Sequence, residues 1–242
     1  MVKDNLDKAR NIFKKAEADG RSFLLEPEVY ALLKLFGFRV PAHVFLPAGK
    51  KLQVEQLKKI SSGKAVVKVV SPLIQHKSEV GGVAIVKNSV REIDLAIKNR
   101  KKQVEAAVLP LTGDKDISQA EVEASIKGFL IVELVDYLQV GFGSEILLGF
   151  IATLDFGPVV AFGGGGLDVQ YLDVHIKPAR SLAILPSLPL SRQAIKAALE
   201  KTAIYGKVAE EFRGRKPLIQ PELLIQAVQI FQSIGRGFSL FN

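Results

Sequence analysis

The sequence predicts an α+β fold in two lobes. Helices flank a first group of short apolar strands, and a second, mainly antiparallel group of strands is followed by more helices. A polar, turn-rich stretch over residues 109–127 separates the two groups, as at a boundary between lobes. The 242 residues suit one large domain or two smaller lobes. We therefore expect an N-terminal helix over residues 1–21, a first lobe over 22–115 and a second lobe over 116–242.

The first half of the chain should alternate helices with short strands. Apolar residues that recur on one face predict a helix over residues 4–18, which Gly20 ends. A second helix over residues 23–36 has Pro27 in its first turn and ends at Gly37. The other elements expected here are strands over residues 44–46, 64–70 and 83–86 and helices over residues 54–60 and 90–108.

The second half should be rich in strands before it becomes helical. Its apolar runs predict strands over residues 129–135, 145–151, 159–162 and 169–176, and helices over residues 192–211 and 220–233. The chain contains no repeat of fixed period, which argues against a solenoid or a propeller.

The net charge of +8 raises the question of nucleic-acid binding. Lys and Arg are scattered in short groups with acids between many of them, and aromatic residues make up only 7% of the chain. This pattern favours solubility, or attraction of anionic substrates such as ATP and CoA, over a nucleic-acid surface. Without Cys or an N-terminal apolar signal, the chain is expected to be cytoplasmic. The single Met and the abundant Lys, Arg and Ile are typical of a thermophile.

Lys68 is the first candidate site residue, because it interrupts an otherwise apolar strand. Burying an unpaired ammonium group is costly, so this lysine needs either an anionic partner or a route to solvent. A lysine on an edge strand that reaches water is the structural alternative. Both possibilities remain open from the strand alone.

The loop after this strand places several phosphate-binding groups together. His76 can act as a nucleophile and carry a phosphoryl group, and Lys77 and Ser78 offer donors to phosphate oxygens. Gly81 and Gly82 allow backbone N–H groups to approach an anion. Taken alone, however, a histidine in a loop is more often an ordinary surface residue.

The second half carries a glycine run and several carboxylates. The run Gly163–Gly166 could cradle phosphates, although no Gly-Lys-Ser/Thr of a P-loop follows and a simple turn is the alternative. Glu133 and Glu145 interrupt apolar strands, and Asp168 and Asp173 flank the next predicted strand. Such carboxylates either bind sugar hydroxyls or hold Mg²⁺ near a nucleotide, or are half-exposed strand residues without a ligand.

Four segments, in this order, point to a known family: Leu24–Glu28, Phe36–Pro41, Lys68–Gly82 and Phe156–Gly163. Over about residues 20–235 the chain resembles the ATP-grasp β subunit of ADP-forming acyl-CoA synthetases, which are relatives of succinyl-CoA synthetase. The resemblance implies a two-lobed ATP-grasp fold with a nucleotide between the lobes.

The resemblance also implies roles for individual residues. Lys68 matches the lysine that contacts ATP phosphates, and His76 matches the histidine proposed to receive the phosphoryl group. Further nucleotide contacts would come from Ser78, Gly81 and Gly82 in the phosphate-covering loop, Glu133 and Val135 in the adenine hinge, Glu145 near ribose and phosphates, and Gly165 and Gly166 after the apolar strand. Asp173 matches a metal ligand.

The reaction implied is the interconversion of acyl-CoA, ADP and phosphate with free acid, CoA and ATP. The cofactors would be ATP or ADP with Mg²⁺, and this chain would handle the nucleotide. A separate α subunit, which binds CoA and activates the acyl group, would be its partner in a hetero-oligomer.

Departures from the family pattern leave a second hypothesis open. Ala152–Leu154 replaces an Arg-Asp-Pro sequence, Gln170 stands where the family has Glu, and the connection through Tyr137–Phe142 is longer than usual. The chain also ends at Asn242, before an acidic family segment that completes the Mg²⁺ site. Either that segment is cut off or lies in another chain, or the protein is a degenerate, non-catalytic ATP-grasp module that binds a nucleotide or a partner.

Overall fold

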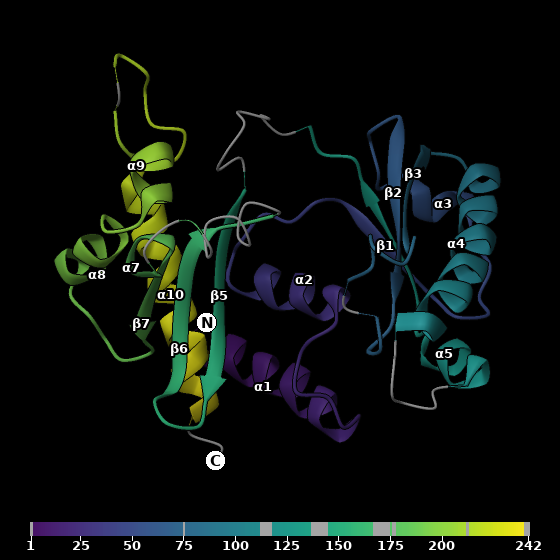
Figure 1. Cartoon of the computed structure of the whole chain (residues 1–242), viewed down its shortest axis with the longest axis horizontal. Coiled ribbons are helices and arrows are strands. Elements are labelled where there is room, and N and C mark those ends of the chain that lie inside the picture. The colour runs from purple at the N-terminus through teal and green to yellow at the C-terminus, as the bar shows by residue number, and fades with distance from the viewer. Residues whose placement is uncertain are drawn as a thin grey trace. The chain divides into compact units, whose positions relative to one another are not determined.

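The computed structural model describes residues 2–74, 76–111, 118–136, 145–166, 175, 178–211 and 213–239. The chain forms two compact units, which are described separately (Figure 1). One unit contains residues 11–136, and the other contains residues 1–10 and 137–242. Helix α1 (Val2–Ala18) has its residues up to 10 in the unit that contains residues 137–242, and its remaining residues in the unit of residues 11–136.

The unit of residues 11–136 is built on a four-stranded antiparallel sheet of order β1-β4-β2-β3. Its strands are β1 (His43–Pro47), β2 (Lys64–Val70), β3 (Val83–Lys87) and β4 (Gly128–Glu133), and its helices are α2 (Glu26–Leu35), α3 (Val54–Leu57), α4 (Val90–Leu111) and α5 (Gln119–Ser125). The predicted boundary between residues 115 and 116 is therefore wrong. Strand β4 lies inside the first sheet, so the unit continues to Asp136.

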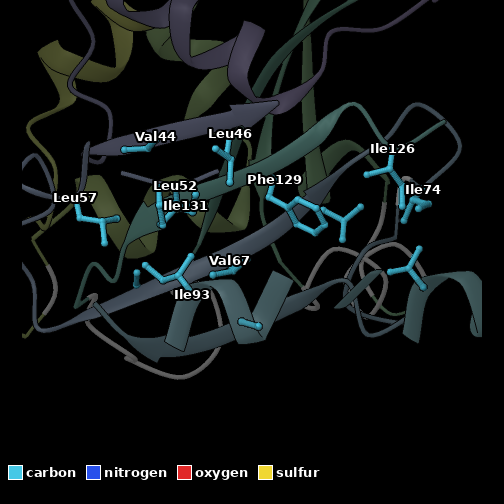
Figure 2. Packing of buried hydrophobic residues seen from close by; sticks show 14 of the residues in the cluster. Val44, Leu46, Leu52, Leu57, Val67, Ile74, Ile93, Ile126, Phe129 and Ile131 are labelled. Atoms are coloured by element: carbon cyan, nitrogen blue, oxygen red, sulfur yellow. The ribbon is translucent and has the colours of Figure 1, made fainter. Parts of the chain in front are cut away.

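One face of this sheet forms the main core of the unit, shown in Figure 2. Val67 on β2 and Ile131 on β4 are paired across the strands and are both fully buried. Helix α4 lies along this face, and its Ile93 and Val104 belong to the same cluster. This packing fixes the pleat of β2, because successive side chains of a strand point to opposite faces.

The opposite face of the sheet is covered in part by the start of α2. Leu25 and Tyr30 pack there against Val70, Leu130 and Val132. Since Val67 and Val69 point into the main core, Lys68 must point to this second face. The alternation of β2 thus brings a lysine to the side of the sheet where α2 begins.

The other unit contains a three-stranded antiparallel sheet of order β5-β6-β7. Its strands are β5 (Ile146–Thr153), β6 (Gly157–Gly164) and β7 (Leu182–Pro186), and its helices are α7 (Pro178–Ser181), α8 (Arg192–Leu199), α9 (Ala203–Ala209) and α10 (Pro221–Ser239). Helix α10 packs along β5 and β6 (Figure 1). None of the helices that the structure describes is long and apolar enough to span a membrane.

The predicted α+β class is confirmed, and so are most of the elements. The helix expected over residues 192–211 is instead two helices, because Thr202 caps α9 by accepting a hydrogen bond from the N–H of Tyr205 at 3.3 Å. Helices α5 and α7 and strand β7 were not predicted. The strand expected over residues 169–176 lies almost entirely outside the described residues.

Gly128, the first residue of β4, gives a prediction about stability. A Cβ at this position would lie 2.2 Å from the carbonyl oxygen of Leu46 and 2.9 Å from Cα of Pro47. Because these are backbone atoms of β1, we expect Gly128→Ala to lower the free energy of unfolding by about 3 kcal/mol. Urea denaturation of the full chain would measure it. Gly63→Ala is the control, since a Cβ there meets nothing within 4 Å; equal losses in the two variants would contradict the prediction.

Candidate functional site

Lys68 lies on an interior strand of its sheet. Its Cα partners are Leu130 on β4 and Val83 on β3, so the edge-strand alternative is excluded. The side chain is 27% exposed, and its Nζ donates a hydrogen bond to Oε1 of Glu26 at 2.6 Å. Of the two possibilities that the sequence left open, an anionic partner is thus present, at the start of α2.

The carboxylate of Glu26 binds a second lysine as well. Nζ of Lys77, in the loop after β2, donates to Oε2 of Glu26 at 3.0 Å, and the hydroxyl of Tyr30 donates to Oε1 at 3.2 Å. Burial alone would raise the pKa of Glu26, but the hydrogen bonds and charges of Lys68 and Lys77 outweigh it and lower that pKa. Burial and the neighbouring Glu26 raise the pKa of Tyr30. Glu26 is therefore ionised at neutral pH and shared between two ammonium groups.

Local sequence explains why α2 begins at Glu26. Pro27 occupies the first turn, where its missing N–H costs no helical hydrogen bond. The carboxylate of Glu28 accepts a hydrogen bond from the N–H of Leu25 at 2.7 Å. It also accepts two from the guanidinium of Arg21, at 2.8 and 2.7 Å. This arrangement fixes the first turn, and the positive end of the helix dipole there favours a carboxylate at Glu26.

The loop after β2 is closed by its own backbone. The N–H of Gly82 donates to the carbonyl of Lys77 at 2.6 Å, and that of Gly81 donates to the carbonyl of Ser78 at 3.3 Å. The N–H of Val69 donates to the carbonyl of Gly82 at 2.9 Å, which ties the loop to β2. Gly81 has a φ of 67°, a left-handed conformation that favours glycine. Both glycine N–H groups are thus used inside the loop, so binding a phosphate through them would require these bonds to open.

His76 projects from this loop into solvent. Its side chain is 74% exposed, and Nδ1 lies 3.6 Å from Oε1 of Glu79, which is 66% exposed. Ser78 is exposed too, whereas Lys77 is only 19% exposed. The preceding Gln75 lies outside the described residues. The loop therefore presents an accessible imidazole while its lysine is held inward by Glu26.

The predicted hinge residues lie at the end of β4. The carboxylate of Glu133 accepts a hydrogen bond from the N–H of Ala42 at 2.8 Å, and the N–H of Glu133 donates to the carbonyl of Ala42 at 2.9 Å. These two bonds anchor the chain just before β1. Val135 is 49% exposed at the end of the unit. The Glu133 side chain thus has a structural partner, and its contact with adenine remains a prediction.

In the other unit, Glu145 and the glycine run lie together where β5 begins and β6 ends. The N–H of Gly165 donates to the carbonyl of Glu145 at 2.9 Å. Gly166 has a φ of 64°, and a Cβ there would lie 2.7 Å from Oε2 of Glu145. The absence of a side chain at Gly166 therefore leaves room for the carboxylate of Glu145, at the end of the β5–β6 pair. The structure thus brings predicted residues together in two groups. One is Lys68 with the loop that carries His76, and the other is Glu145 with Gly165 and Gly166.

The predicted metal site falls where the structure gives no description. Asp173, Gln170 and Asp168 all lie outside the described residues, as does the long connection Tyr137–Phe142. Within the described parts of the chain, no group of three or more His, Cys, Asp or Glu residues could hold a metal ion. The assignment of Asp173 to Mg²⁺ thus stays a prediction.

The residue that the sequence did not assign is Glu26. It lies in the family segment Leu24–Glu28, and an acidic partner was one of the two possibilities for Lys68, but 42 residues separate Glu26 from Lys68. Tyr30 was missed in the same way, because a tyrosine in a helix is usually a packing residue. The need of Lys68 for a counter-charge pointed to an acidic residue, and Tyr30 contacts that residue in turn. Neither residue could be identified without the fold.

Comparisons with known proteins identify the family of this chain. A family model described as an ATP-grasp domain matches residues 15–235. The beta subunit of acetate–CoA ligase [ADP-forming] I of Pyrococcus furiosus is 31% identical over 216 residues, which cover 89% of this chain and 80% of that protein. The 4-hydroxybutyrate–CoA ligase [ADP-forming] of Nitrosopumilus maritimus is 34% identical over 178 residues, but the match covers 73% of this chain and only 23% of that larger protein.

A solved structure of an acetyl-coenzyme A synthetase is also similar to this chain. The acetyl-coenzyme A synthetase 1 of Ca. Korarchaeum cryptofilum, in complex with coenzyme A and Ca-AMPCP, superposes with a TM-score of 0.66 and 26% identity, covering 96% of this chain and 87% of that one. The family model covers most of the chain, and the match to the Pyrococcus furiosus subunit covers most of both proteins. The chain therefore belongs to the ATP-grasp domain family, among the β subunits of ADP-forming acyl-CoA synthetases.

Proposed function

We propose that this chain is the nucleotide-handling subunit of an ADP-forming acyl-CoA synthetase and moves a phosphoryl group between ATP or ADP and His76. One observation carries the proposal. The loop that exposes His76 is tied through Lys77 and Glu26 to Lys68, a half-buried lysine on an interior strand. An accessible imidazole, in a loop whose lysine is held with a second lysine on one carboxylate, offers a nucleophile and positive charge for the transfer of a charged phosphoryl group.

The proposed step exchanges one bond to the γ-phosphorus for another. The unprotonated ring nitrogen of His76 attacks the γ-phosphorus of ATP, and the new N–P bond forms as the P–O bond to ADP breaks. ADP leaves with the bonding electrons, and the ring, which keeps its other N–H, becomes positively charged. Glu79 lies beside Nδ1, so we expect Nε2 to attack and the carboxylate to stabilise the charged ring. The reverse step makes ATP from ADP.

Nucleotide binding would use both groups of residues. We assign phosphate contacts to Lys68, Ser78, Gly81 and Gly82, adenine contacts to Glu133 and Val135, and ribose and phosphate contacts to Glu145, Gly165 and Gly166. The half-buried Lys68 fits this role, because its ammonium group carries charge and, among the described residues, donates to Glu26 alone, which leaves N–H donors for a phosphate. Gly166 fits it too, since its missing Cβ leaves space in front of the Glu145 carboxylate.

A divalent metal would accompany the nucleotide. We propose Mg²⁺, with Asp173 as a ligand, and Glu145 is the nearest described carboxylate to the glycine run. Carboxylate oxygens are suitable ligands for this ion, which normally keeps several waters and binds the phosphates as well. When bound, the metal would neutralise charge on the phosphates.

The chain would work with a CoA-binding, acyl-activating α partner. The relatives that share its sequence are named for different acids, acetate and 4-hydroxybutyrate. This difference suggests that the shared region handles the nucleotide, and that the acid is chosen elsewhere in the complex. The acyl substrate is therefore assigned to the partner and not to this chain.

Titration calorimetry of the full chain tests the proposal. We expect Mg-ATP and Mg-ADP each to bind with a dissociation constant of about 1 μM to 1 mM, the range of ordinary enzyme substrates. Omitting Mg²⁺ should weaken the binding of both nucleotides. If neither nucleotide binds, the assignment of nucleotide handling to this chain fails.

A further inference from the structure

Glu26 joins two parts of its unit that are far apart in the sequence. It lies 42 residues before Lys68 on β2 and 51 residues before Lys77 in the His76 loop. Each lysine uses a different oxygen of the same carboxylate, at 2.6 and 3.0 Å. The His76 loop is therefore linked to β2 in two ways: by its own backbone hydrogen bonds, and through one side chain of a third element, α2.

The Glu26–Lys68 and Glu26–Lys77 pairs are less exposed to solvent than an ordinary surface ion pair. The side chains of Glu26, Lys68 and Lys77 are 21%, 27% and 19% exposed. Partly buried charges are screened less by water and salt than exposed ones. The His76–Glu79 pair in the same loop is far more exposed and at 3.6 Å is too long for a hydrogen bond, so it should hold the loop only weakly.

We propose that Glu26 is a positioning residue for phosphoryl transfer: it holds Lys77, and with it the His76 loop, at a fixed place beside Lys68. The inference rests on the function proposed above. Without the carboxylate, the two ammonium groups would repel each other and the loop would lose its link to α2. With it, the three groups carry a net charge of +1, and each lysine keeps two of its three N–H donors for a phosphate.

The proposal separates the rate of transfer from the affinity for nucleotide. Glu26→Gln keeps one acceptor oxygen, so it can bind one lysine, but its NH₂ group cannot accept a hydrogen bond from the other. The substitution also raises the local charge from +1 to +2, which favours anion binding. We therefore expect nucleotide affinity to be kept or increased, while misplacement of the loop slows phosphorylation of His76 on the order of 10- to 100-fold.

The experiment compares two measurements on the full chain: the initial rate of His76 phosphorylation by γ-labelled Mg-ATP, and the dissociation constant of Mg-ATP by calorimetry. The control is Glu28→Gln, in the same helical turn, because Glu28 binds Arg21 instead of the two lysines. The thermal stability and the transfer rate of Glu28→Gln show how far loosening the first turn of α2 lowers these two quantities when both lysine contacts of Glu26 are kept. Lys77→Met tests the same link from the loop side while leaving Glu26 bound to Lys68.

The expected result is a slow transfer with undiminished affinity in Glu26→Gln, a similar loss in Lys77→Met, and no further loss when the two are combined. A normal or faster rate of His76 phosphorylation in Glu26→Gln would overturn the inference about Glu26 but would leave the proposed function intact. Equal losses of rate in Glu26→Gln and Glu28→Gln, in step with their thermal stability, would also overturn it, because they would indicate a purely structural role. If the wild-type chain is not phosphorylated at all, the proposed function fails and the inference fails with it.

Discussion

His76→Ala should abolish the ATP-dependent phosphorylation of this chain. The substitution removes the exposed nitrogen nucleophile of the loop, and the amine of the neighbouring Lys77 is held inward by Glu26. The His76 side chain is 74% exposed, and its observed polar contact within the described part of the chain is the 3.6 Å approach to Glu79, so its loss should leave the thermal stability almost unchanged. The measurement is incorporation of an acid-labile label from γ-labelled ATP, with and without a phosphorylated partner.

His175→Ala is the matched control, since it removes another exposed histidine of the same chain. It should retain the label in full. The dissociation constant of Mg-ATP should be similar in both variants, because His76 acts after binding. Undiminished labelling of His76→Ala would show that the phosphoryl group is carried elsewhere, and the assignment of His76 as its acceptor would be wrong.

The sequence predicted the kind of environment that Lys68 needed but not the residue that provides it. The interruption of an apolar strand by Lys68 was enough to infer that the lysine needed a counter-charge or a route to solvent. It was not enough to find Glu26, because that pairing depends on the packing of α2 against one face of the sheet. Such contacts between distant segments are set by tertiary structure, which periodicity does not encode.

The lobe boundary was misplaced for a related reason. The polar stretch over residues 109–127 is typical of a linker, and the sequence placed it between lobes. Strand β4, which follows it, pairs with β1 and β2 because its buried residues, such as Leu130 and Ile131, complete both faces of the first sheet. Strand pairing between distant segments is decided by these packing partners, so a change in local composition could not reveal it.

Lys68→Met should separate catalysis from stability. Loss of an ammonium group that stabilises charge on the transferred phosphoryl group should reduce the rate of His76 phosphorylation by about 100-fold or more. The unfolding free energy should fall by less than about 1 kcal/mol, because Glu26 keeps Lys77 and Tyr30 as partners and is not left unpaired. The unbranched Met side chain also replaces the buried stem of the lysine.

The double variant Lys68→Met/Lys77→Met shows whether this explanation of stability is right. It removes both ammonium groups and leaves the Glu26 carboxylate, 21% exposed, with only the Tyr30 hydroxyl among its observed hydrogen-bond partners. Breaking a buried pair from one side is costly because it leaves an uncompensated charge, so we expect a loss of about 3 kcal/mol, more than the two single losses added together. Adding Glu26→Gln should then restore most of the stability, since it removes the unpaired charge, while the transfer rate stays low. If the single losses simply add, and the third substitution restores nothing, then the lysines stabilise the unit by packing alone and Glu26 does not act as their shared counter-ion.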